Sequence, residues 1–447
     1  MHRHFIHTSG LSVTSSFKPL ITDLYNTTNT SLVSLIDGLA SPNSGLNTIA
    51  KTARDLRDYK INYLTPTDSK LYIDSSGFHI VKGVVAAYDI SKFINCYNWY
   101  LESEYEVYDY IFSLDIGSFI NDPSASTKEN IYNLNKKSIS ESIAIIKNNM
   151  IIKDKFIYVL HFKDLAQYHI FDKLYDELEV YKYSKCFSLG GMVSLNGLTD
   201  SPLDFAPFIG GAFWSLYQYK THSNFEYPFK LHLLGVYWKS FRFCMFFIEE
   251  LFNNYLEPKN QKAELTYDSV NYLITAMFKA QVGFACQSMS EDNSNLEEYD
   301  TIWDIPDRVI NQIYRTPESR DIFNRNLELA QINARLENLN YLTNLNVHSQ
   351  LELDKFFVFI IRKYKLVELM VDSNYNYNSF KNKSNHILNN LPSMYKCLSN
   401  QNVKQIQNSL KYIFAFHNWY NNDGTKAKFD VLMEMFIKKI NFRYTLS

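Results

Sequence analysis

Short runs of apolar, β-branched or aromatic residues recur along the first two thirds of the chain, and each run ends at a polar residue or a glycine. Runs of this length and composition are typical of buried β-strands. The clearest runs predict strands at residues 70–73, 108–114, 156–161, 186–189, 231–234 and 264–267. The pattern also indicates a strand near residues 5–8 and a weak last strand near 282–286.

Longer segments with helical apolar spacing separate these strands. They predict helices at residues 90–105, 128–149, 164–180 and 239–255. Strands that alternate with helices favour a parallel sheet, and a (β/α)8 barrel needs about 31 residues for each unit, with insertions lengthening some units. A doubly wound open sheet is the main competitor, but the chain has no GxGxxG or Walker-type loop. We therefore expect an α/β fold with a (β/α)8, or TIM, barrel over residues 1–300.

The pattern changes near residue 300. Beyond it, strand-like runs fade and long amphipathic patterns follow, as at 319–342 and 351–372. These patterns predict a mostly helical C-terminal region over residues 301–447, packed on or beside the barrel.

Composition narrows the class of protein. Hydrophobic residues make up 46% of the 447 residues and charged residues 21%, which excludes disorder throughout. The net charge is −2, from 45 basic and 47 acidic side chains. Such a chain has no strong basic field, so any contact with a nucleic acid must use a local patch.

The cysteines and the N-terminus bear on compartment and cofactors. The five cysteines lie far apart, with no CxxC or CxC pair, which argues against a disulfide framework and a zinc site. The N-terminal residues do not form a signal peptide, and the longest apolar stretches fall far short of the roughly 20 residues of a membrane helix. We expect a soluble, cytoplasmic protein with no membrane partner and no metal cofactor.

Three aspartates follow predicted strands: Asp74, Asp115 and Asp268. Side chains at the carboxyl ends of barrel strands meet in one mouth. Each aspartate alone is as readily explained as a helix cap or an Asx turn. Three together favour chemistry at an anomeric carbon, with one carboxylate as nucleophile and another transferring protons.

Two other strand ends carry candidate residues. Gly190 and Gly191 would bring bare backbone N–H groups close to a planar ligand, although a tight turn explains them equally well. His161 could donate a hydrogen bond to a ligand carbonyl, although a histidine there is more often structural.

The order of these segments resembles one enzyme family. The segments are Asp-Ser-Ser-Gly-Phe (74–78), Leu-Asp-Ile-Gly-Ser-Phe (114–119), Leu-Gly-Gly-Met-Val (189–193), His-Leu-Leu-Gly-Val (232–236) and Thr-Tyr-Asp-Ser (266–269). Together they resemble the tRNA-guanine transglycosylase superfamily. Its members are (β/α)8 barrels that replace guanine in a polynucleotide by a 7-deazaguanine base.

The resemblance implies a role for each matching position. It makes Asp268 the nucleophile, Asp74 the acid and base, and Asp115 the carboxylate that recognises the base. The other implied substrate contacts are backbone donors at Gly190 and Gly191, a wall at Gly235, and side chains that sandwich the base at Phe78 and Leu234.

Departures from the tRNA enzymes refine the resemblance. The chain has no CxCxxC-plus-His zinc motif, and 33 residues separate Gly235 from Asp268, a longer gap than the tRNA enzymes are expected to have. The pattern is more similar to the DpdA-like enzymes of bacteria and phages, which insert 7-deazaguanines into DNA. The implied partners are DNA, or else tRNA, a base such as 7-cyano-7-deazaguanine, and helper proteins.

Other readings of the same residues stay open. They are a tRNA enzyme that lacks zinc, a non-catalytic paralogue that binds nucleic acid, and an unrelated barrel hydrolase acting on a sugar. A target base inside a duplex must be flipped out to reach a barrel mouth. Lys239 and Arg242 are candidates for contacting the phosphates, unless they belong to a solvated helix face.

Overall fold

The computed structural model describes residues 5–8, 30–35, 70–75, 77, 80, 85, 87–119, 122–162, 164–191, 205–236, 238–269, 350–422 and 424–437. Eight β-strands lie within these ranges. They are β1 (Phe5–Thr8), β2 (Thr30–Ser34), β3 (Lys70–Asp74), β4 (Tyr110–Phe112), β5 (Phe156–His161), β6 (Cys186–Gly190), β7 (Phe229–Leu233) and β8 (Ala263–Ser269).

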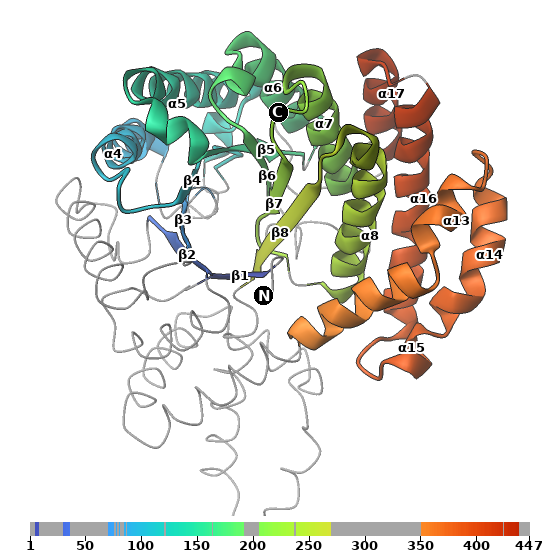
Figure 1. Ribbon diagram of the computed structural model, residues 1–447. Helices are drawn as coiled ribbons and strands as arrows, with labels where there is room; N and C mark the ends of the chain where they lie inside the picture. Colours follow the sequence, from blue (N-terminus) through green and yellow to red (C-terminus); the bar gives the residue numbers. More distant parts are fainter. Residues whose placement is uncertain are drawn as a thin grey trace, which may run out of the picture.

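The strands form one parallel sheet that curls round on itself (Figure 1). Each strand pairs with the next one along the chain, and β8 also pairs with β1. The carboxyl ends of the strands therefore lie at the same rim of the sheet. The register sets Ser34 opposite Asp74 and His161 opposite Gly190 at that rim.

Five α-helices follow β3 to β7 and cover the outer side of the sheet (Figure 1). They are α4 (Ile90–Ser103), α5 (Lys128–Asn148), α6 (Leu165–Glu177), α7 (Ala206–His222) and α8 (Lys239–Leu256). Short 3-10 helices lie at Ala87–Asp89, Pro123–Ala125, Met150–Asp154, Val180–Lys182 and Glu257–Lys259. The protein thus has an α/β fold with a curled parallel sheet.

Local sequence explains where two of these helices begin. The Thr127 side chain accepts a hydrogen bond from the Asn130 N–H and caps α5. The Asp164 carboxylate accepts from the Gln167 N–H, at 2.8 Å, and caps α6. Both side chains satisfy N–H groups that a helix start leaves without an intrahelical partner.

The two faces of the sheet form different parts of the core. Leu71, Ile73 and Ile111 belong to the large core shared with the helices, whereas Phe112 and Val159 belong to a smaller cluster inside the curl. Side chains alternate between the faces of a strand. By this alternation the last inward positions are Asp74 on β3, His161 on β5, Gly190 on β6 and Asp268 on β8.

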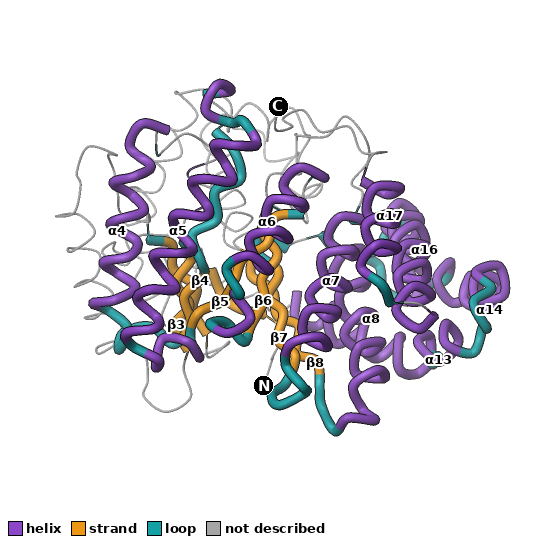
Figure 2. The backbone as a smooth tube through the Cα atoms, turned by 90° about the horizontal axis from the view of Figure 1, so that it is seen from above, coloured by secondary structure: helices purple, strands orange, loops and turns teal. Residues whose placement is uncertain are grey.

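The C-terminal part is helical and packs against α7 and α8 (Figure 2). It comprises a helix over 350–363 followed by α13 (Leu366–Val371), α14 (Tyr377–Asn389), α15 (Leu391–Met394), α16 (Asn400–Asn422) and α17 (Lys426–Ile437). The rings of Phe213 on α7 and Phe416 on α16 stack at 5.5 Å. These helices share one hydrophobic core with the α/β part.

The observed strands agree closely with most of the strands predicted from the sequence. The seven strands predicted between residues 5 and 267 are all present, and the bounds of β5 match fully. The pattern missed β2 and α7, and the continuous helix expected over 351–372 breaks at Lys365, whose φ is 50°. The predicted segments 282–286 and 319–342 lie outside the described residues.

In the part of the chain that the structure describes, no helix is both long and apolar enough to cross a membrane.

Candidate active site

The loop that follows β4 is held in place by neighbouring helices. The Asn135 side chain on α5 accepts from the Ile116 N–H at 3.0 Å and donates to the Ile116 carbonyl at 2.8 Å. The Gln167 amide on α6 donates to the Gly117 carbonyl, at 3.0 Å. These bonds fix the backbone that directly follows Asp115, in a loop without regular secondary structure.

Asp115 is the centre of a buried polar cluster. Its Oδ2 contacts the His161 Nε2, and its Oδ1 accepts a hydrogen bond from the Ser75 hydroxyl, at 2.9 Å. Asp115 and His161 are each 4% exposed. Since an ionised carboxylate can only accept, the His161 Nε2 carries the proton of this contact. Two of the predicted substrate contacts, Asp115 and His161, are therefore direct neighbours.

Glycines allow this cluster to close. A Cβ on Gly190 would lie 2.9 Å from the His161 Nε2 and 3.0 Å from the Asp115 Oδ2. A Cβ on Gly77 would collide with the same carboxylate. Glycine is thus required by close approach at both positions. Gly191, which follows Gly190, has a φ of 84° and is half-buried.

Asp268 is the centre of a second cluster, at the end of β8. Its Oδ1 accepts from the Gly235 N–H at 2.9 Å and lies 3.1 Å from the His232 Nε2. Gly235 reaches the carboxylate with a φ of 73°, a conformation that favours glycine. The Val236 N–H also donates to the Asp268 carbonyl, at 2.8 Å. The turn after β7 therefore donates hydrogen bonds to both the side chain and the backbone carbonyl of Asp268.

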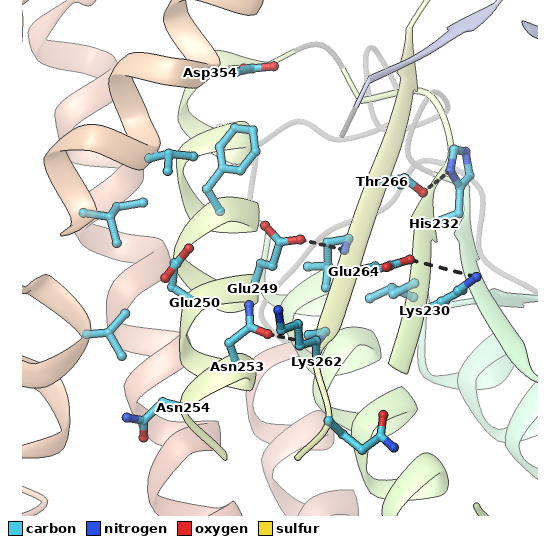
Figure 3. A pocket seen from close by; sticks show the side chains of 18 of the residues that line it. Lys230, His232, Glu249, Glu250, Asn253, Asn254, Lys262, Glu264, Thr266 and Asp354 are labelled. Carbon is cyan, nitrogen blue, oxygen red and sulfur yellow. Dashed lines mark hydrogen bonds and ion pairs between the residues drawn. The ribbon is translucent and has the colours of Figure 1, made fainter. Parts of the chain in front are cut away.

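His232 is the residue of this cluster that the sequence analysis left without a role. Its Nδ1 lies 2.9 Å from the Thr266 hydroxyl, and its ring packs 4.9 Å from the ring of Phe112. His232 and Thr266 face each other across β7 and β8 (Figure 3). Strand alternation could have found this set, because His232 precedes Leu234 by two residues and Thr266 precedes Asp268 by two.

Asp74 lies at the end of β3 and is half-buried. The Leu35 N–H donates to its carbonyl at 3.1 Å, which ties the ends of β2 and β3 together. The next residue, Ser75, contacts Asp115 as described above. The segment that carries Asp74 therefore continues directly into the Asp115 cluster.

The remaining predicted residues have different outcomes. Leu234 is half-buried and packs on the cluster inside the curl, whereas Phe78 lies outside the described residues. The Lys239 ammonium donates to the Cys397 carbonyl, at 2.7 Å, and burial lowers its pKa. Its suggested contact with phosphate stays a prediction.

Arg242 does not suit the same suggestion. It is 3% exposed, and its guanidinium bonds Asp354 at 2.7 Å and the Tyr267 hydroxyl at 3.2 Å. A buried guanidinium that is already paired with a carboxylate cannot reach a phosphate, so Arg242 leaves the candidate set. Its position on the inner side of α8 explains the difference from the sequence reading.

A large cavity is lined by residues near the amino-terminal ends of the strands, by α8 and by the helix over 350–363 (Figure 3). Its volume is about 1680 Å³, and its lining mixes both charge signs, including Lys230 and Glu264 with 3.9 Å between their charged atoms. It extends to His232 and Thr266, on the side of these residues away from the rim. The mixed lining indicates no particular ligand.

Among the described residues, no group of three or more His, Cys, Asp or Glu side chains is arranged to hold a metal ion. No family model matches the sequence, and comparisons with curated proteins and with solved structures also return no match. The function must therefore be argued from the two carboxylate clusters themselves.

Proposed function

We propose that this protein is a base-exchange transglycosylase that replaces guanine in DNA by a 7-deazaguanine derivative through a covalent glycosyl-aspartate intermediate. The observation that carries the proposal is the Asp268 carboxylate, a buried group held by the Gly235 N–H and His232 at the rim of the sheet. A carboxylate fixed in this way suits a nucleophile that must attack and then leave from one position.

The first displacement uses Asp268 and Asp74. A carboxylate oxygen of Asp268 bonds the anomeric carbon of a deoxyguanosine while the bond from that carbon to guanine breaks. Asp74, acting as the acid, supplies the proton that the departing guanine needs. The products are free guanine and a glycosyl ester on Asp268.

The second displacement reverses these roles. Asp74, now ionised, takes the ring N–H proton of the incoming 7-deazaguanine, whose nitrogen bonds the anomeric carbon. The ester bond to Asp268 breaks and its carboxylate is restored. Two inversions at the same carbon retain the configuration of the sugar.

The Asp115 cluster suits recognition of the base. A guanine-like base presents N–H donors on its pairing edge, and a buried carboxylate is a strong acceptor for them. The Gly190 backbone, the His161 ring and Asp115 lie together, so one planar base could meet an acceptor and backbone groups at once. The half-buried Leu234 would then pack on its face.

The remaining features of the proposal rest on the family resemblance. They are the complete (β/α)8 barrel, with helices after all eight strands, and DNA rather than tRNA as the polymer. Helper proteins that open the duplex also belong here, because the net charge of −2 gives little general attraction to a polyanion.

The direct test is a guanine-exchange assay. The protein is incubated with radiolabelled guanine or 7-cyano-7-deazaguanine and with either DNA or tRNA, alone and with a host or phage lysate. We expect label to enter DNA. Asp268→Asn should abolish incorporation, whereas Asp154→Asn is a matched control, because the Asp154 side chain is 66% exposed near the start of β5.

The other outcomes separate the competing readings. Label that enters tRNA alone would identify the tRNA-directed relative, and release of base without exchange would identify a hydrolase. No label in either polymer, with the protein folded and the lysate present, would overturn the enzymatic proposal.

A further inference from the structure

The Asp268 carboxylate is the end of a chain of side-chain contacts that crosses two strands. Thr266 on β8 meets the Nδ1 of His232 on β7, and the Nε2 of the same ring meets the Asp268 Oδ1, at 2.9 and 3.1 Å. Because Asp268 Oδ1 is an acceptor, Nε2 carries a proton toward it. Thr266 can donate or accept, so it fits Nδ1 in either protonation state of the ring.

The imidazole has little freedom to leave this arrangement. His232 is 3% exposed, and its ring packs against those of Phe112 and Tyr72, with centroids 4.9 and 6.2 Å away. A donor that is already oriented and desolvated costs no reorganisation when charge develops on its partner.

We propose that His232 is a positioning residue that stabilises Asp268 as a leaving group, and so governs the second displacement of the exchange reaction more than the first. This inference rests on the proposed function. In the second step the ester bond breaks and its electron pair returns to the Asp268 carboxylate. The His232 Nε2–H and the Gly235 N–H face the oxygen on which part of that charge develops.

The same hydrogen bond has the opposite effect on the first step. There the carboxylate begins charged and becomes a neutral ester, so a donor to it lowers its nucleophilicity. Loss of the His232 donor should therefore leave the first displacement intact and slow the second. A role limited to supporting the fold would slow both steps together.

The test measures the two steps separately in His232→Phe. Release of labelled guanine from DNA in one turnover reports the first step, and incorporation of 7-cyano-7-deazaguanine reports the second. We expect guanine release within about threefold of the wild type, incorporation slower by about 100-fold, and accumulation of the protein–DNA adduct.

Further variants keep the test informative if His232→Phe folds poorly. His232→Gln keeps an N–H donor and should restore most of the incorporation rate. Thr266→Val should slow incorporation in the same way as His232→Phe, but by less. His222→Phe is the matched control, because His222 stacks on Tyr181 at the end of α7 and both rates should be unchanged.

The outcomes separate this inference from the proposed function. A wild-type protein that neither releases nor incorporates base, even with lysate, overturns both. A wild-type protein that exchanges bases overturns the inference alone if His232→Phe slows both steps equally, slows neither, or is not rescued by Gln.

Discussion

The Asp115 carboxylate contacts the His161 imidazole across 46 residues of sequence, from the loop after β4 to the last residue of β5. The contact brings together a carboxylate and an imidazole whose proximity the sequence does not indicate, because each lies at the end of a different predicted strand. Gly190 lies opposite His161 in the register with β6, so the ends of three neighbouring strands contribute to one buried cluster.

This close packing predicts the effect of a methyl group at residue 190. Gly190→Ala should lower the free energy of unfolding by about 1–3 kcal/mol, because the new Cβ overpacks His161 and Asp115. Urea denaturation measures the change. In a His161→Ala background the same substitution should cost less, and an unchanged cost would show that the strain arises elsewhere.

Asp115 itself should act on base binding. Asp115→Asn removes a charged acceptor, so we expect the KM for the incoming base to rise by about 10- to 100-fold while guanine release changes less. Ser75→Ala removes one hydrogen bond to the carboxylate and keeps its charge. A KM effect of Ser75→Ala as large as that of Asp115→Asn would argue against Asp115 as the base-recognition group.

Strands that consist of a continuous run of apolar residues could be predicted from the sequence. β5 is buried along its whole length, and its bounds follow directly from the run Phe-Ile-Tyr-Val-Leu-His. β2 has the sequence Thr-Ser-Leu-Val-Ser, in which only two residues are apolar, so no strand signal stands out. The apolar periodicity also continues through Lys365, where the backbone turns.

The sequence predicted the site residues that follow strands, but not those inside a strand or those paired over a long sequence distance. Asp115, Asp268 and Gly190 all follow apolar runs. The inward placement of Asp268 and Gly190 comes from strand alternation, whereas Asp115 lies in the loop after β4 and is placed by the bonds that hold this loop. His232 was missed because it lies inside a strand, where a histidine reads as part of the core. The pairing of Arg242 with Asp354 spans 112 residues, and no local pattern could reveal it.

The Arg242–Asp354 pair should contribute to stability rather than to DNA contact. It joins α8 to the helix over 350–363, and Asp354 also accepts a hydrogen bond from the hydroxyl of Tyr267, the residue before Asp268. Asp354→Ala should cost about 3–5 kcal/mol, because it leaves a buried guanidinium without its carboxylate. Thermal and urea unfolding measure this loss.

A double variant checks the same assignment. Arg242→Met with Asp354→Leu should recover much of the stability, since no charge remains buried. A large change in the salt dependence of DNA binding, with little change in stability, would instead return Arg242 to the phosphate contacts.

His417 gives a pH dependence. Burial lowers the pKa of this α16 imidazole from 6.5 to about 4. Between these values the unfolded chain binds the proton and the folded chain does not, so stability is complete above pH 6.5 and falls as the pH drops toward 4. The expected loss is about 3 kcal/mol between pH 7 and pH 4.

The measurement is urea unfolding at several pH values, beside His417→Gln. That variant keeps polar groups at this position but has no titrating ring. Between pH 7 and pH 4 it should therefore lose about 3 kcal/mol less stability than the wild type. Parallel losses in both proteins would mean that His417 titrates normally in the fold.

The central claim is that Asp268 forms a covalent bond to the sugar. The most direct measurement is to incubate the wild-type protein with guanine-containing single-stranded DNA in the absence of an incoming base, denature it, and map the cross-linked peptide by mass spectrometry. The account predicts a DNA adduct on Asp268 that disappears when 7-cyano-7-deazaguanine is added, with no adduct in Asp268→Asn. Base exchange without any adduct, or an adduct that persists in Asp268→Asn, would contradict it.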